Sequence, residues 1–262
     1  MTNQDPAPPK RSMSMKALAF ALVGLLGFVF YALYNQQVFP SASIDLKLSQ
    51  KEAAKKSRSF AANVGYDLGR AMDVTTFAED DEAKRVLEFK LGIDQANRLM
   101  KEQVPVWLWR TRFCKELSKD ELVVVWTTQG TFKSMFHTFE NDKKLPSISQ
   151  DDALALAKEF VGKNTGLDLS AYELFDRGSE TKPNRTDHHF VWRRAGFSES
   201  EFRIRVEVAG NQVATCRYWL SPSDTWTREY ESIRQWNDLL GNTASCFLLL
   251  LVAVTIGAFI YG

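Results

Sequence analysis

The sequence predicts an α+β fold with two tandem modules, each a helix on an antiparallel sheet, between two transmembrane helices. Stretches of 18 and 19 residues without a charged side chain lie near the ends, at 17–34 and 243–261. Between them, one pattern of residues recurs 100 positions later, and β-branched and aromatic segments follow each copy. These observations predict the order helix, module, module, helix along the chain.

Both charge-free stretches are long enough to cross a bilayer. At ~1.5 Å per helical residue they reach roughly 27 to 29 Å, close to the ~30 Å hydrocarbon core. A cleaved signal peptide is the alternative for the first stretch, but its apolar run is longer than such peptides need. A buried core helix is the alternative for the second, whose residues are apolar on every face, as lipid requires.

The charges before the first stretch predict the orientation. Three basic residues against one acid precede it, so residues 1–16 are expected to be cytoplasmic. Residues 35–242 are then expected to be extracytoplasmic, in a cell-membrane protein with two spans and with lipid as a partner. No Lys or Arg follows the second span, which is typical of a chain interrupted early.

The composition excludes several classes of protein. Lys and Arg total 33 against 32 Asp and Glu, so the net charge of +1 gives no reason to expect nucleic acid as a partner. The charged fraction of 25% is ordinary for a folded chain, and three cysteines cannot build a disulfide scaffold.

Residues 35–143 are expected to form the first module. Ser49 caps a helix, Glu52 completes a capping box, and Gly65 follows where that helix would end. An antiparallel sheet of about three strands follows. An additional amphipathic helix is expected as an insertion at about 79–101, because the second module lacks these residues.

Residues 144–222 are expected to form the second module. Ser149 and Asp152 repeat the capping box, Gly166 repeats the helix end, and a second sheet of about three strands follows. Residues 223–242 are expected to form a juxtamembrane helix. Its apolar stripe either lies in the membrane interface or packs on the second module.

Aromatic and guanidinium groups on the predicted strands form the candidate binding site. Alignment of the two copies pairs Trp109 and Arg110 with Trp192 and Arg193. An antiparallel sheet that is solvated on one side can bind a peptide there, so these four residues are candidates for a peptide-binding face. The alternative is cross-strand packing and surface ion pairs, together with the neighbouring Arg203, Arg205 and Arg217.

No pattern in the chain predicts a catalytic, cofactor or metal site. His188 and His189 are adjacent and would point to opposite faces of a strand, so they cannot readily bind one metal ion. The acidic run 79–82 lacks the pattern of a calcium loop and suits the start of a helix. Cys114 and Cys216 form either a disulfide or two buried thiols.

Several of these features occur together in a known family. They are Leu48-Ser49 with Glu52-Ala53 and Phe60, Trp109-x-x-Arg112-Phe113, Ile148-Ser149, Arg185-Thr186-Asp187-His188, and Tyr230 with Asn237 before the second span. In this arrangement residues 35–242 resemble the extracytoplasmic N-terminal region of some bacterial CPBP-family intramembrane proteins. That family includes CAAX prenyl endopeptidase-like metalloproteases. Each module resembles a PepSY-type unit.

The resemblance implies a zinc-dependent protease core of membrane helices with a Glu-Glu-x-x-x-Arg motif and two histidine motifs. This chain has no Glu-Glu pair, and His137-Thr138-Phe139-Glu140-Asn141, which fits the last motif, ends a predicted exterior strand. We therefore expect a non-catalytic membrane-anchored module, without a cofactor, that binds a peptide or a membrane protein. The alternatives are a truncated CPBP-family zinc metalloprotease and a structural envelope protein that packs through Ala253 and Gly257.

Overall fold

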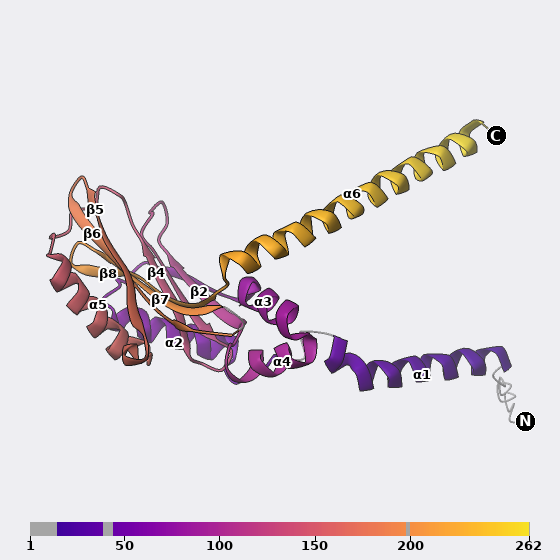
Figure 1. Ribbon diagram of the computed structural model, residues 1–262, viewed down its shortest axis with the longest axis horizontal. Helices are drawn as coiled ribbons and strands as arrows, with labels where there is room; N and C mark the ends of the chain where they lie inside the picture. The colour runs from indigo at the N-terminus through magenta and orange to yellow at the C-terminus, as the bar shows by residue number, and fades with distance from the viewer. Residues whose placement is uncertain (1–14, 39–43, 198–199, 262) are drawn as a thin grey trace, which may run out of the picture.

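A computed structural model describes residues 15–38, 44–197 and 200–261 and shows an α+β fold, which confirms the predicted class. One eight-stranded antiparallel sheet forms its centre, and two long helices leave it at one end (Figure 1). The helices are α1 (Met15–Val38), α2 (Gln50–Asn63), α3 (Asp81–Leu91), α4 (Ile93–Glu102), α5 (Gln150–Asn164), the 3-10 helix η2 (Leu169–Ala171) and α6 (Asp224–Tyr261). The strands are β1 (Met72–Glu79), β2 (Trp107–Cys114), β3 (Glu121–Thr127), β4 (Phe132–Thr138), β5 (Glu173–Lys182), β6 (Arg185–Ala195), β7 (Glu201–Ala209) and β8 (Gln212–Ser221). Most of the predicted cytoplasmic segment 1–16 lies outside the described residues.

The strand order β1-β2-β3-β4-β8-β7-β6-β5 divides the sheet into two halves of four strands. Each half is a meander preceded by a helix, α2 before β1 and α5 before β5. The halves join where β4 and β8 pair, with Met135 opposite Cys216. The prediction of two separate sheets with about three strands each is therefore wrong. Each meander ends on a strand with an open edge, and pairing the two edges satisfies their backbone groups.

Helices α2 and α5 cover the same face of the sheet. Side chains alternate between the faces of a strand, and Val124 of β3 and Val206 of β7 pack in the core under these helices. α2 lies over β1 to β3, and α5 lies over β6 to β8. The Phe60 and Phe160 rings meet between them, with centroids 6.5 Å apart. No described helix packs on the opposite side of the sheet, which we call the uncovered face.

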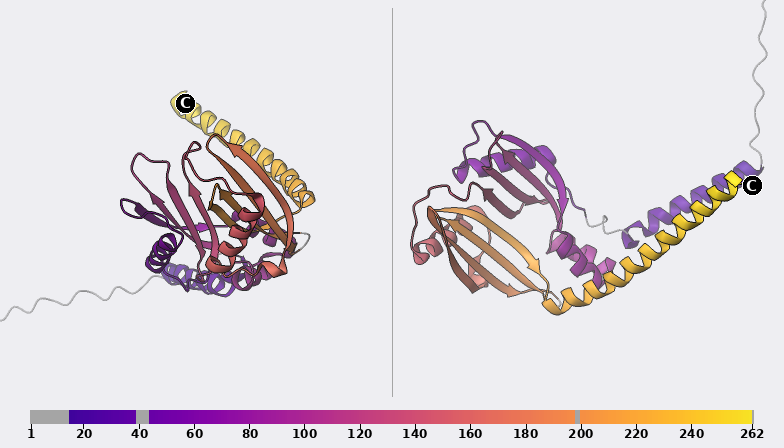
Figure 2. Two further views of the ribbon diagram at one scale, coloured as in Figure 1. Left: turned by 90° about the vertical axis from the view of Figure 1, so that its left-hand side faces the viewer. Right: turned by 90° about the horizontal axis from the view of Figure 1, so that it is seen from above.

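The predicted insertion at 79–101 consists of two helices, α3 and α4, instead of one. Gly92 separates them with a φ of +74°, a conformation that favours glycine. Their apolar residues form a second core with the ends of the sheet and the start of α6, including Val86, Met100 and Trp226. This core lies at the end of the sheet from which α1 and α6 leave (Figure 2).

α1 and α6 each contain an apolar segment long enough to cross a membrane, and none of the most apolar window of either helix is buried. The expected juxtamembrane helix 223–242 and span 243–261 are one uninterrupted helix. Its 38 residues reach roughly 57 Å at ~1.5 Å per residue, about twice the thickness of a hydrocarbon core. The last charged residue of α6 is Asp238, so the preceding four turns connect the apolar segment to the sheet.

Candidate interaction face and membrane junction

The structure does not bring the four predicted site residues together. Trp192 is only 3% exposed and lies in the core under α5. The Trp109 indole is also on the helix-covered side, where its Nε1 donates a hydrogen bond to the Leu48 carbonyl at 2.7 Å. Arg110 and Arg193 follow these tryptophans directly and therefore point to the uncovered face. A common face of all four residues is thus excluded, because neighbours on a strand point to opposite sides.

The arginines occupy a row that crosses all eight strands on the uncovered face. Directly paired residues of neighbouring strands share a face, so the strand register defines the row. From β1 to β5 in sheet order it contains Thr76, Arg110, Val125, Ser134, Arg217, Arg205, Val191 and Asp176. We call this set the arginine row. Its central positions, on β3 and β4, are small side chains between two arginines.

Two pairs of arginines lie directly opposite each other on this face. Arg205 is opposite Arg217, and Arg193 is opposite Arg203. Like charges directly opposite each other destabilise a sheet. Arg193 and Arg203 share the Glu201 carboxylate at 3.5 and 2.9 Å, which reduces the repulsion between them.

The partners in the arginine row are unequal. Arg205 Nε lies 2.7 Å from Glu207. Arg217 instead lies over the Trp219 ring, 4.8 Å from its centroid. Among the described residues, neither Arg217 nor Arg110 has a carboxylate within ion-pair distance. Arg217 and Arg110 are therefore the arginines of the row that no described carboxylate neutralises by direct contact.

A shallow cavity of about 320 Å³ opens beside the row. Its charged lining is already paired: Arg205 with Glu207, and His189 with Asp176 at 3.2 Å. A ligand in this cavity would have to compete with these internal ion pairs.

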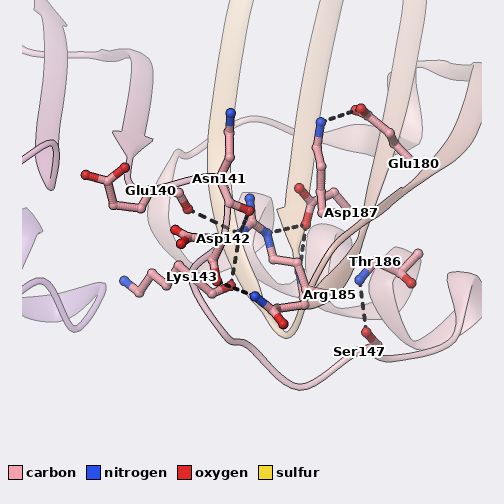
Figure 3. A network of polar contacts seen from close by, with 12 residues as sticks. Glu140, Asn141, Asp142, Lys143, Ser147, Glu180, Arg185, Thr186 and Asp187 are labelled. Atoms are coloured by element: carbon pink, nitrogen blue, oxygen red, sulfur yellow. Dashed lines mark hydrogen bonds and ion pairs between the residues drawn. The ribbon is translucent and has the colours of Figure 1, made fainter.

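Arg185, part of the family-like pattern, is a structural clamp. Its side chain is buried against the linker between the halves (Figure 3). Nη1 donates to the carbonyl oxygens of Glu140, Asn141 and Lys143 at 3.3, 2.9 and 3.0 Å. Nε forms an ion pair with Asp187 at 2.8 Å. These contacts hold the linker that connects β4 to α5.

A serine and a histidine are hydrogen-bonded under the covered face, but their role is structural. Ser179 Oγ lies 2.7 Å from His188 Nδ1, and His188 Nε2 lies 3.0 Å from the Ile148 carbonyl. Gln150 donates to the same serine oxygen at 3.2 Å. In the first half Trp109 holds the matching carbonyl of Leu48 with its own N–H. The histidine thus holds the residue before a helix cap, as the tryptophan does.

The other residues considered for metal binding have separate roles. His188 and His189 point to opposite faces, and His137 Nε2 lies 2.7 Å from Asp120. In the acidic run 79–82, Asp80 caps α3 and forms a largely buried ion pair with Lys133 at 2.8 Å. Among the described residues, no three potential metal ligands gather.

All three cysteines are free thiols. Cys216 is fully buried at the join between the halves, and burial raises the pKa of its thiol to about 12. Cys114 is partly exposed, and Cys246 is exposed on α6. The structure therefore has Cys114 and Cys216 as thiols and not as a disulfide.

An aromatic cluster joins α3 to the base of α6. The Trp226 and Tyr230 rings of α6 stack with centroids 5.1 Å apart. Phe89 of α3 meets both rings edge-on, at 6.5 and 6.0 Å. Lys90 and Glu229 form an ion pair at 3.3 Å beside them. We call this contact the membrane junction, because it ties the sheet to a helix with an apolar segment.

Sequence reasoning identified the arginines of β7 and β8 but not the residues beside them. Glu201, Arg203, Arg205 and Glu207 occupy every second position of β7. This period of two was visible in the sequence and would have placed all four on one face. No sequence pattern indicated the Asp80–Lys133 ion pair, because its two residues are 53 positions apart.

No family model, no curated protein and no solved structure matches the chain. The resemblance to CPBP-family proteins and to PepSY-type units therefore stays a prediction.

Proposed function

We propose that this chain is a non-catalytic binding module, anchored in a membrane by α1 and α6, that binds a peptide or a membrane protein on its uncovered face. One observation carries the proposal. Both sheet-packed helices lie on one side of the eight-stranded sheet. On the other side no described helix packs, and arginines and aromatic rings lie beside a buried apolar cluster of Leu108, Val123 and Val125. An antiparallel sheet with one solvated face is a suitable surface for a partner.

The membrane junction supports a role in which partner binding on the sheet shifts α6 relative to α3. It joins the second core to the first turns of α6 through Phe89, Trp226 and Tyr230. Two buried polar atoms there, Glu88 Oε1 and Trp226 Nε1, have no hydrogen-bond partner among the described residues. Such groups cost free energy, so α6 can shift at this contact more cheaply than at a fully satisfied one.

The proposal places residues 35–242 outside the cytoplasm and the partner in or near the same membrane. The excess of basic residues before α1 supports this orientation. The resemblance to CPBP-family proteins supports a membrane protease as the partner that the module positions or regulates.

Photo-crosslinking in intact cells tests the binding face. A photoreactive amino acid is placed at Thr76 or Glu180, which are exposed on the uncovered face. Matched control positions are Lys55 and Lys158, which are exposed on α2 and α5. We expect one discrete crosslinked partner from the first two positions only. Equal crosslinking from the helix positions, or none from the sheet, would contradict the proposal.

Thiol labelling tests the orientation. Leu117 is fully exposed in the loop between β2 and β3, so Leu117→Cys in a Cys114→Ser background provides a reactive site. A membrane-impermeant maleimide should label it on intact cells. Labelling that requires cell disruption would place the module in the cytoplasm.

A further inference from the structure

We infer that the uncovered face binds an acidic peptide in an extended conformation, with Arg110 and Arg217 as its two anchoring residues. This inference rests on the proposed function and specifies the chemistry of the partner. Three features support the inference: two arginines of the row have no ion pair, the row has a defined geometry, and carboxylates flank it.

The two arginines without an ion pair favour a negatively charged partner. Arg217 lies opposite Arg205, and only Arg205 has a carboxylate within ion-pair distance among the described residues. Asp80 interacts electrostatically with Arg217, but its carboxylate is already bound to Lys133 and to the Ala83 amide. A carboxylate from outside would relieve the repulsion between the two arginines and form charge-assisted hydrogen bonds.

The geometry sets the spacing of the acids in the partner. Arg110 on β2 and Arg217 on β8 are separated by β3 and β4, so three strand spacings of ~4.8 Å place their backbones roughly 14 Å apart. An extended chain advances ~3.4 Å per residue, so four residues cover this distance. Residues i and i+4 of an extended chain point to the same side, as the two arginines require.

The two residues of the arginine row between Arg110 and Arg217 determine which side chain fits at the central position of the peptide. Val125 and Ser134 lie there, and both are small and largely buried. Residue i+2 of the peptide points to the same side as the two acids and would lie over this pair. A small apolar side chain fits there, because a large one would lift the carboxylates away from the guanidinium groups. The expected motif is acid, any residue, small apolar residue, any residue, acid.

A peptide fits this face better than nucleic acid does. Glu201 and Glu207 stand beside the arginines, and the net charge of the chain is only +1. A continuous phosphate backbone would meet these carboxylates, whereas a peptide places its negative charges at selected positions. The same carboxylates would repel an anionic membrane surface.

Fluorescence anisotropy with the full chain in zwitterionic nanodiscs tests the inference. The probe is a fluorescein-labelled peptide with the core Glu-Ser-Val-Ser-Glu. Controls are the same peptide with both Glu replaced by Gln, and one with the two Glu side by side. We expect the probe to bind more tightly than either control, and its affinity to fall as salt screens the charges.

Variants identify the residues. Arg110→Gln and Arg217→Gln should each weaken probe binding about tenfold, the loss expected for a hydrogen bond between charged groups. Arg177→Gln is the matched control, because Arg177 is an exposed strand arginine on the other face. It should leave the affinity unchanged. The melting temperature of Arg217→Gln should change little, because removal of the like-charge contact with Arg205 offsets loss of the contact with the Trp219 ring.

The outcomes separate this inference from the proposed function. Equal binding of the neutral peptide, or no loss in the two arginine variants, would overturn the inference. Crosslinks confined to the uncovered face would still support a binding module in that case. Absence of probe binding would also overturn the inference. Binding to anionic nanodiscs that needs Arg110 and Arg217 would identify lipid headgroups as the partner and reject the peptide.

Discussion

The two halves of the sheet share their element order and several contacts, but different residues make those contacts. In each half a serine caps the helix, and the carbonyl of the preceding residue accepts a ring N–H from the second strand. Trp109 donates to Leu48 in the first half, and His188 lies within hydrogen-bond distance of Ile148 in the second. The position rather than the residue type is shared, so matching Trp109 with Trp192 by sequence gives the wrong structural pair.

The halves also differ in what they add to this framework. The first half carries α3 and α4 between its first two strands and thereby builds the second core and the membrane junction. The second half turns tightly between β5 and β6 and carries four arginines on the uncovered face. The two halves therefore differ in structure: the first contacts the long helix α6, and the second carries most of the arginines on the uncovered face.

The largest expected effect comes from the buried ion pair that only the first half contains. Lys133→Met should lower the free energy of unfolding by about 3–5 kcal/mol, because Asp80 would stay buried without its partner. Lys84→Met removes a more exposed pair with Glu79 and should cost less than about 1 kcal/mol. Urea denaturation in detergent micelles measures both. Similar costs for the two variants would show that burial of the Asp80 pair does not matter.

The hydrogen bonds that His188 and Trp109 make to the residue before each helix cap provide a second comparison. His188→Phe should cost about 1–3 kcal/mol, because Ser179 Oγ and the Ile148 carbonyl both lose a partner. Trp109→Phe leaves only the Leu48 carbonyl without its donor and should cost about 1 kcal/mol. The same denaturation experiment measures the difference. If Trp109→Phe lowered the free energy of unfolding more than His188→Phe does, the expected order of the two costs would be wrong.

The helix caps should behave alike in both halves. Ser49→Ala and Ser149→Ala each remove a hydroxyl that accepts an amide N–H, so each should cost about 1 kcal/mol. Ser49→Asp and Ser149→Asp should retain most of the stability, because an aspartate also caps. If only one of the two alanine variants lost stability, the two serine caps would not stabilise their helices equally.

A histidine of the first half should make the stability depend on pH. Burial lowers the pKa of His137 although the Asp120 carboxylate opposes this shift. The unfolded state therefore takes up this proton first, and stability should fall as the pH drops below about 6.5, the ordinary histidine pKa. His137→Gln should reduce this loss between pH 7.5 and pH 5.5. Unfolding midpoints of the parent chain and the variant across this range test the prediction, and an unchanged loss in the variant would contradict it.

Asp80 adds a separate effect at lower pH. Burial alone would raise the pKa of Asp80, but the Lys133 ammonium and the Ala83 amide outweigh it and lower the pKa. Its contribution to stability is therefore present above the ordinary aspartate pKa of about 3.9 and is lost as the pH falls through the lower folded value. Asp80→Asn should remove this acid transition, and Asp81→Asn, whose side chain is exposed, should retain it.

Local features were predictable because neighbouring residues cause them. Ser49 and Ser149 cap their helices as predicted, and Gly65 and Gly166 adopt the positive φ that ends a helix. The edge strands β1 and β5 were harder to predict, because most of their residues are exposed and no buried stripe marks the strand. The insertion was predicted, but its break at Gly92 was not.

The candidate site was only partly predictable for a related reason. Residue type indicated arginines and tryptophans, but the strand period places Arg193 and Trp192 on opposite faces. The register decides which arginines become neighbours, and Arg205 and Arg217 meet because β7 and β8 pair in one particular way. Adjacency in sequence therefore suggested a cluster that the strand geometry does not allow.

The sequence by itself determined the α+β class, the two capped helices and the two apolar segments, because these depend on contacts within a few residues. Only the tertiary structure decided that the two meanders form one sheet, that the arginines form a row and that α3 meets α6. The reason is that backbone pairing and side-chain packing between distant segments depend on register. A shift of one residue moves every side chain of a strand to the other face.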